Sequence, residues 1–292
     1  MEKHIERAYG FLETQIKRGG FDCFIGEDRT LKNGKLSPPE VGSSLFALET
    51  AYKCRNDSET TKSILPYIQK FLTTDSKIYF FMEHNRLSLD AETTAYGLAA
   101  LWELHAIERQ CIEPILSEIA SNIDSEKRVR VYFEPCTKEN RIDLVSAVNI
   151  LHLFHLMGRQ TEVSQTEKWI REALEKNFWE SRYYHSPDTF PYFLSRMVAL
   201  FPKRFLGWKE LILQSLAKRY GISRYPLDLA MRITVAKRLG VNPTREETEL
   251  LRQQQGDGGC PADAIYHWGR SIGYFGSRAI STMLAIEALS VS

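Results

Sequence analysis

Apolar residues recur at helical spacing along the whole chain. Residues 108–123 show the pattern, with an apolar stripe formed by Cys111, Ile112, Ile115, Leu116 and Ile119. Such spacing is typical of a helix that buries one face and exposes the other. The same pattern predicts five more amphipathic helices, over residues 4–17, 60–72, 165–178, 208–219 and 245–255.

A second group of segments is more apolar and richer in small residues. These segments cover residues 43–53, 91–105, 143–157, 189–201, 228–239 and 277–289. A helix that is apolar on most faces is a buried helix. Small side chains at Ala95, Gly97 and Ala99 permit neighbouring helices to approach closely. We therefore expect an inner set of helices that the amphipathic set covers on the outside.

Similar polar residues mark where the inner helices begin, at Glu40, Asp90, Asp143, Asp188, Asp228 and Ser277. The intervals between these markers are 50, 53, 45, 40 and 49 residues. A recurrence in this range indicates an array of helix pairs, because each pair buries its apolar face only against its neighbours. The chain has no Gly/Ser-rich linker, so we predict an all-α (α/α)6 toroid. This double ring of about twelve helices would form a single domain over residues 1–292.

The amino-acid composition bears on which classes of binding partner the protein has. The 292 residues include 38 basic and 37 acidic side chains, so no excess of positive charge favours nucleic acid. No apolar run reaches the roughly 18 residues that span a bilayer, and the first residues do not resemble a signal peptide. The five cysteines have neither zinc-ligand nor redox spacing. These features predict a cytoplasmic protein with reduced thiols.

In such a ring the starts of the inner helices gather at one end, around a funnel where we expect the function. Short aromatic segments precede them, and their rings would line this funnel. The candidates are Tyr79, Phe81, Tyr132, Tyr184, Tyr225, Tyr266 and Trp268. The face of a desolvated ring stabilises a cation by about 0.5–2 kcal/mol. The alternative for each ring is that it only fills space between helix layers.

Two stretches carry a family resemblance. Residues 253–261 read Gln-Gln-Gln-Gly-Asp-Gly-Gly-Cys-Pro, and residues 274–279 read Tyr-Phe-Gly-Ser-Arg-Ala. They resemble the Gln and Asp-Gly-Gly repeat signature of squalene–hopene cyclases, other class II terpene cyclases and protein prenyltransferase β subunits. Cys260 stands where those repeats usually carry an aromatic residue. Residues 90–95, Asp-Ala-Glu-Thr-Thr-Ala, resemble the protonating motif of class II terpene cyclases, Asp-x-Asp-Asp-Thr-Ala or Asp-x-Asp-Thr-Thr.

The resemblance implies an enzyme of isoprenoid biosynthesis that cyclises a linear isoprenoid. The reaction would begin when an acid protonates the substrate and would proceed through a carbocation. Glu92 stands at the position of the family's acid, with Asp90 as its partner and Thr93 as a hydrogen-bonding support. Burial and mutual repulsion keep one of two neighbouring carboxyl groups protonated near neutral pH. Glutamate replaces the family's aspartate here, and its carboxyl reaches about 1.5 Å further.

Structural roles are the alternatives for both carboxylates. Asp90 is a favoured helix N-cap residue, and Asp143, Asp188 and Asp228 at equivalent repeat positions favour capping as a shared role. Glu92 lies in the first helical turn, where the helix dipole favours a negative charge.

Metal sites receive weaker support. Asp257, Cys260 and His267 do not have the zinc-ligand spacing of the prenyltransferases, and His152 and His155 share a face of an otherwise apolar helix. We predict no metal site and no cofactor, with Mg²⁺ as the one candidate if the substrate is a diphosphate. The basic residues that would then bind the diphosphate are Arg128, Arg130, Lys138 and Arg141.

Two other functions stay open. One is a toroid that binds a lipid or a protein without catalysis. The other is a carbohydrate-active (α/α)6 enzyme, which needs two carboxylates about 5–10 Å apart. The candidates for that pair are Asp22, Asp90, Asp143, Asp188 and Asp228. Familiar class II cyclases place the active site between two toroids. This chain would close its funnel alone or borrow a wall from a second copy or a partner subunit.

Overall fold

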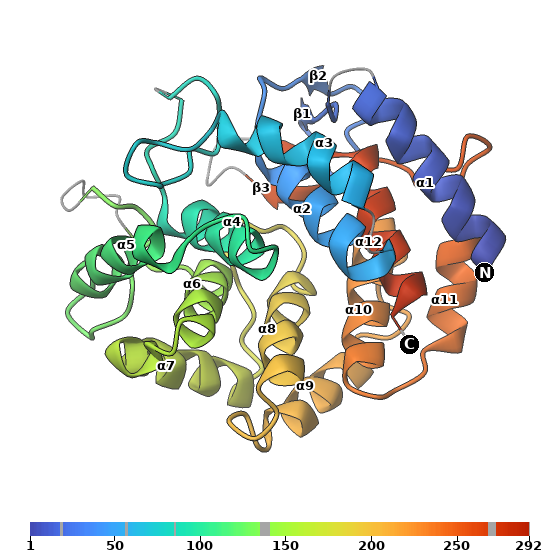
Figure 1. The fold of residues 1–292 in the computed structure, drawn as a ribbon. Helices are drawn as coiled ribbons and strands as arrows, with labels where there is room; N and C mark the ends of the chain where they lie inside the picture. The colour runs from blue at the N-terminus through green and yellow to red at the C-terminus, as the bar shows by residue number, and fades with distance from the viewer. Residues whose placement is uncertain (18–19, 56–57, 85, 135–140, 268–272, 292) are drawn as a thin grey trace. The chain divides into compact units, whose positions relative to one another are not determined.

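The computed structural model describes residues 1–17, 20–55, 58–84, 86–134, 141–267 and 273–291 (Figure 1). The chain divides into two compact units. Unit 1 comprises Met1–Ser37, Phe46–Ile64 and Ser181–Ser292, and unit 2 comprises Pro38–Leu45 and Leu65–Glu180.

Unit 2 contains two inner helices, α4 (Ala91–Glu103) and α6 (Leu144–Leu156), which pack against each other (Figure 1). Two outer helices cover them, α5 (Arg109–Ser121) on α4 and α7 (Ser164–Glu175) on α6, and a 3₁₀ turn (Gln160–Val163) precedes α7. Nearly every residue of α4 and α6 is buried. The outer helix α5 buries one stripe, made of Ile112, Ile115, Leu116 and Ile119. The predicted division into inner and outer helices is therefore confirmed in this unit.

Unit 1 repeats this arrangement with α8 (Thr189–Leu200), α10 (Pro226–Arg238) and α12 (Arg278–Ser290) as buried helices. Helix α10 contacts both α8 and α12. On the outside, α9 (Trp208–Ala217) packs on α8, α11 (Thr244–Arg252) on α10, and α1 (Glu2–Lys17) on α12 (Figure 1). None of the helices in the described ranges is long and apolar enough to cross a membrane.

Helices α2 (Gly42–Thr50) and α3 (Ser58–Gln69) account for the two remaining predicted segments. A π-helical turn, Ala51–Arg55, continues α2. Each of the two helices has residues assigned to both units.

A small antiparallel sheet in unit 1 adds to the predicted all-helical pattern. Its strands are β1 (Phe24–Gly26), β2 (Lys35–Leu36), β3 (Asp263–His267) and β4 (Tyr274–Ser277), in the order β2-β1-β4-β3. The helical pattern of the sequence predicts no strands. Strands of two to five residues are too short for alternation to reveal them.

Four of the predicted markers accept hydrogen bonds from the first backbone N–H groups of the helices that follow them. Before α2, Glu40 accepts from Ser43 at 3.1 Å. Asp90 accepts a hydrogen bond from the backbone N–H of Thr93, and Ser277 accepts one from Ile280. Asp143 accepts from the backbone of Val145 and Ser146. These bonds satisfy N–H groups that have no partner inside the helix.

The expectation of capping was wrong for Asp188 and Asp228. Asp188 precedes α8 but makes no side-chain cap bond, and Asp228 lies inside the first turn of α10. Both carboxylates instead bind arginine side chains, which offer stronger, charge-assisted hydrogen bonds than a backbone N–H does.

The Asp-Gly-Gly signature holds helix ends together. Asp257 pairs with Arg278 at the start of α12, with N–O distances of 2.7 and 2.9 Å. The Gln254 amide donates to the carbonyl oxygens of His4 in α1, at 2.7 Å, and of Gly258, at 2.9 Å. The signature thus ties α1 and α12 to the end of α11, which is an architectural role.

Gly258 provides a test of this role. Its φ is +94°, and a Cβ atom there would lie 2.1 Å from the carbonyl oxygen of Arg7. We expect Gly258→Ala to lower the free energy of unfolding by about 1–3 kcal/mol, because strain and a backbone clash combine. Gly256→Ala is the matched control, since a Cβ there would meet nothing within 4 Å. Denaturant unfolding measures both variants, and equal losses would contradict this account.

Candidate functional site

Asp90 lies at the start of α4 with one carboxylate oxygen capped and the other isolated. Its Oδ1 accepts from the backbone N–H of Thr93 at 2.6 Å. Its Oδ2 is buried and has no hydrogen-bond partner among the described residues. Burial raises the pKa of Asp90 to about 6, because the hydrogen bonds from Thr93 offset only part of the lost hydration. Asp90 is therefore both a cap and a carboxyl group that ionises reluctantly.

Glu92 is held by two side chains from α6. Its Oε2 accepts from the Ser146 hydroxyl at 2.5 Å, and its Oε1 accepts from the Asn149 amide at 2.8 Å. Glu92 is 9% exposed, and Ser146 and Asn149 are almost fully buried. Ser146 and Asn149 are one turn apart, so they share a face of α6. The packing of α4 on α6 therefore fixes where the Glu92 carboxyl lies.

Ser146 and Asn149 are not among the site residues predicted from the sequence. The sequence contains a weak indication of their role. Both are polar residues one turn apart on a helix that is otherwise almost entirely apolar. A buried polar side chain needs a partner, so this pair indicated a polar group on a neighbouring helix.

Asp143 adds a third carboxyl group to the same unit. Its Oδ1 accepts from the backbone N–H groups of Val145, at 3.0 Å, and Ser146, at 3.2 Å. The same oxygen lies 3.4 Å from the Ser146 hydroxyl, which also contacts Glu92. Asp143 is 5% exposed. One hydroxyl group thus links the acid candidate to a second buried carboxyl.

Two of the aromatic segments pair with the helix starts, as isolated antiparallel bridges. Ala91 donates its backbone N–H to Val131 at 2.7 Å, and Tyr132 bridges to Asp90. Phe81 bridges to Glu40 in the same manner before α2. The backbone of Tyr132 therefore lies directly beside the start of the helix that carries Glu92.

The predicted substrate-binding residues of unit 2 differ in burial. Phe81 is buried, whereas Tyr79, Thr93 and Tyr132 are half-buried. The Tyr79 ring stacks on His84, with centroids 3.9 Å apart. Their contact with a substrate stays a prediction.

The remaining predicted aromatics belong to unit 1. Tyr184 is buried and packs against Tyr266, with ring centroids 5.1 Å apart. Tyr225 is exposed, and the guanidinium of Arg29 covers its ring face at 4.0 Å. That face already contacts a cation. Trp268 lies outside the described residues.

Two carboxylates proposed for sugar hydrolysis are neutralised in unit 1. Arg29 binds Asp228 with N–O distances of 2.5 and 2.9 Å and also binds Asp263, at 2.6 and 2.9 Å. Burial favours the neutral form of Asp228, but the hydrogen bonds from Arg29 outweigh it and lower the pKa. Asp188 binds Arg219 and the buried Arg232, the latter at 2.8 Å. Both carboxylates are thus held in ion pairs by arginine side chains.

The candidate metal ligands have other contacts. The described part of the chain contains no group of three or more His, Cys, Asp and Glu side chains that could hold a metal ion. Asp257 pairs with Arg278, and His155 lies 3.0 Å from Glu167. His152 lies 4.0 Å from Glu103.

Two residues of the proposed basic cluster already bind other groups of the protein. Arg128 pairs with Asp124 at 2.7 Å, and Arg130 donates to the carbonyl oxygen of Ile123 at 3.1 Å. Arg141 is exposed, and Lys138 lies outside the described residues. Arg128 and Arg130 are therefore held by the protein itself.

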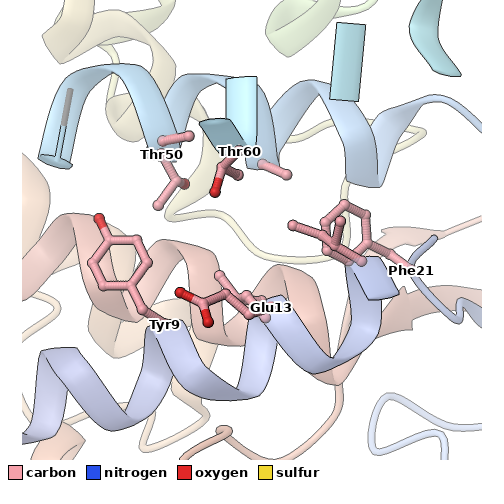
Figure 2. A pocket seen from close by; sticks show the side chains of 9 residues that line it. Tyr9, Glu13, Phe21, Thr50 and Thr60 are labelled. Atoms are coloured by element: carbon pink, nitrogen blue, oxygen red, sulfur yellow. The ribbon is translucent and has the colours of Figure 1, made fainter. Parts of the chain in front are cut away.

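Unit 1 contains a small cavity between α1 and the segments that carry Thr50 and Thr60 (Figure 2). Its volume is about 10 Å³, which is room for one water molecule. A larger groove of about 740 Å³ runs along α11 and is lined in part by Arg224, Arg245 and Arg252. Neither space is lined by the predicted site residues.

Comparison with known proteins links the chain to terpene cyclases. No family model matches the sequence. The drimenol cyclase drtB of Aspergillus calidoustus is 28% identical over 207 residues, which cover 70% of this chain and 38% of the relative. The chain thus spans about 38% of the length of this curated relative.

Two solved structures match nearly the whole chain. A variant of the type II terpene cyclase MstE from Scytonema, solved with its substrate geranylgeranyl dihydroxybenzoate, has a TM-score of 0.73 at 11% identity. The match covers 99% of this chain and 96% of that one. An unsaturated glucuronyl hydrolase from Streptococcus agalactiae has a TM-score of 0.63 at 14% identity, covering 99% of this chain and 90% of that one.

These matches confirm two predictions. The fold is an (α/α)6 toroid, and the resemblance to class II terpene cyclases is confirmed. A cyclase and a hydrolase share this fold, so the fold does not select the chemistry. The sequence similarity over 207 residues is to a drimenol cyclase.

The isolated oxygen of Asp90 predicts a pH dependence of stability. The native state raises the pKa of Asp90 from 3.8 to about 6, so it binds this proton more tightly than the unfolded state does. The free energy of unfolding should therefore fall by about 3 kcal/mol as the pH rises from well below 3.8 to above 6. Asp90→Asn retains a good N-cap residue and removes the titration. Unfolding in urea at several pH values measures both proteins, and parallel pH profiles would show that Asp90 titrates normally.

Proposed function

We propose that this chain cyclises a linear isoprenoid by protonating it and guiding the resulting carbocation to a cyclic product. The observation that carries the proposal is the setting of Glu92. It stands in a class II-like motif, is buried at the start of an inner helix, and is held by Ser146 and Asn149. The toroid fold and the similarity to a drimenol cyclase support the same activity.

Glu92 is the proton donor in this proposal. When it protonates a carbon–carbon double bond, it becomes a carboxylate. The Asn149 amide, 2.8 Å from Oε1, and the Ser146 hydroxyl, 2.5 Å from Oε2, then donate to that negative charge. Donors fixed in advance stabilise developing charge without reorganisation, which lowers the barrier to proton transfer. Asp90 and Thr93 hold the first turn of α4 that carries Glu92.

The substrate class is a small hydrophobic isoprenoid. Aromatic side chains next to the helix starts, such as Phe81 and Tyr132, are the candidates for contact with the cation in unit 2. The proposal includes no resident cofactor, and Mg²⁺ enters only with a diphosphate substrate. A cytoplasmic location belongs to the same proposal, as does completion of the site by a second copy or a partner subunit.

Substitution of the acid tests the activity. Purified protein is incubated with farnesyl diphosphate, geranylgeranyl diphosphate, squalene and geranylgeranyl dihydroxybenzoate, and the extract is analysed by mass spectrometry. We expect a cyclised product from the wild type. Glu92→Gln should lower the rate at least about 100-fold, because it removes the general acid. Glu103→Gln, on the same helix, is the control and should retain activity.

Two outcomes would contradict the proposal. Cyclisation by Glu92→Gln at the wild-type rate would exclude Glu92 as the acid. No product from folded wild type would favour the binding function. In that case the same isoprenoids should raise the melting temperature without turnover, since a ligand that binds the native state stabilises it.

We also propose that residues 1–292 form one domain. A toroid closed by neighbour-to-neighbour packing should unfold cooperatively. Scanning calorimetry should therefore show one transition whose calorimetric and van't Hoff enthalpies agree. Two resolved transitions would contradict the proposal.

A further inference from the structure

The Ser146 hydroxyl contacts two buried carboxyl groups. Its oxygen lies 2.5 Å from Oε2 of Glu92 and 3.4 Å from Oδ1 of Asp143. A hydroxyl has one proton, so it donates to one carboxyl at a time. The other contact is a hydrogen bond only if that carboxyl itself carries a proton. We propose that Glu92 and Asp143 share one proton through Ser146, an inference that rests on the proposed function for its catalytic meaning.

Electrostatics favours the shared proton. Glu92 is 9% exposed and Asp143 is 5% exposed, so water screens their charges poorly. Two ionised carboxylates on one hydroxyl would repel each other strongly in this setting. A single proton removes the repulsion and makes the two groups titrate as a pair.

The backbone decides which member of the pair is ionised. Asp143 accepts from two N–H groups at the start of α6, those of Val145 and Ser146, and these favour the anion. Glu92 receives the Asn149 amide on Oε1, which suits the carbonyl oxygen of a neutral acid equally well. The proton therefore rests on Glu92, which donates to Ser146, while Ser146 donates to Asp143. Asp143 is a positioning residue that keeps Glu92 protonated.

The same chain of contacts returns the proton after each reaction. Transfer to the substrate leaves Glu92 as a carboxylate, and the Ser146 hydroxyl then donates to it. A proton taken up from solvent by Asp143 passes to the Ser146 oxygen as Ser146 gives its own proton to Glu92. One O–H bond forms at Glu92 and one breaks at Asp143, so Ser146 is unchanged and the charge balances.

Other titratable groups also lie on the elements around α4. Asp90 and Tyr132 lie at the same helix start, and Tyr96 lies one turn after Glu92 on α4. On α6, His152 lies near Glu103 at the far end of α4, and His155 lies near Glu167. On α5, Glu113 pairs with Arg109 and Arg159, and Glu118 pairs with Lys77. Asp143 shares the Ser146 hydroxyl with Glu92.

The pH profile of kcat/KM tests the proposal. Asp143→Asn keeps a good N-cap and removes the negative charge, so Glu92 should ionise at lower pH. We expect the alkaline limb to move down by about one pH unit, with an approximately fivefold loss at the pH of the wild-type midpoint. Ser146→Thr, which keeps the hydroxyl, should retain the wild-type profile. Ser281→Ala, which removes a buried hydroxyl from α12, should leave the profile unchanged.

A double variant isolates the role of the hydroxyl. In a Ser146→Ala background, Asp143→Asn should shift the alkaline limb much less than it does alone, because the link between the carboxyls is gone. An unchanged limb in Asp143→Asn, or an equal shift without the hydroxyl, would overturn the shared proton.

A substrate-free measurement separates this proposal from the cyclase function. NMR titration of ¹³C-labelled carboxyl groups follows Glu92 and Asp143 in folded protein. The pair should titrate in two separate steps in the wild type, and Asp143→Asn should leave one step at lower pH for Glu92. Independent titration of the two groups would overturn the shared proton, even if the enzyme cyclises isoprenoids. Absence of cyclised product would overturn the function and leave this result standing.

Discussion

Burial of the inner helices on nearly all sides is the constraint on which the rest of this structure depends. Most side chains of helices α4 and α6 cannot reach water, because an outer helix and the other inner helix cover them. Each buried polar residue on these helices must therefore find a partner inside the protein. Glu92 meets this requirement with Ser146 and Asn149, and the result is a carboxyl group fixed in place.

At the starts of the inner helices, this constraint leads to buried carboxyl groups. The first N–H groups of a helix need acceptors, and Asp90, Asp143 and Ser277 supply them. Because these residues cap buried helices, their carboxyl groups are buried too. Chain segments with aromatic residues pair with these starts, as Tyr132 does with Asp90. The need to cap the inner helices thus places acidic groups beside aromatic segments.

The two units use the same repeat position differently. In unit 2 the acidic residues cap helices, and one of them, Asp90, has an oxygen with no hydrogen-bond partner in the described part of the chain. In unit 1 the corresponding Asp188 and Asp228 bind arginine side chains. A carboxylate bound by arginine is a poor proton donor, whereas a buried carboxyl without a cation holds its proton more tightly. This difference supports our proposal that the acid lies in unit 2.

Local patterns in the sequence determined the helices, the repeat and several of the caps. Helical periodicity needs only neighbours in the chain, and an N-cap bond joins residues three positions apart, as in Asp90 and Thr93. The motif around Glu92 could also be recognised in the sequence, because its residues are consecutive. The small sheet was not, since its strands are short and Phe24 pairs with Gly276.

Tertiary structure alone decided the partners of the buried charges. Ser146 and Asn149 are 54 and 57 residues from Glu92, and Arg29 is 199 residues from Asp228. No local pattern encodes such contacts, because they arise only when separate helix pairs pack together. A polar residue within an apolar helix indicates, from the sequence alone, that it needs a partner. The packing determines which partner it meets, and so decides whether a carboxyl becomes a salt bridge or an acid.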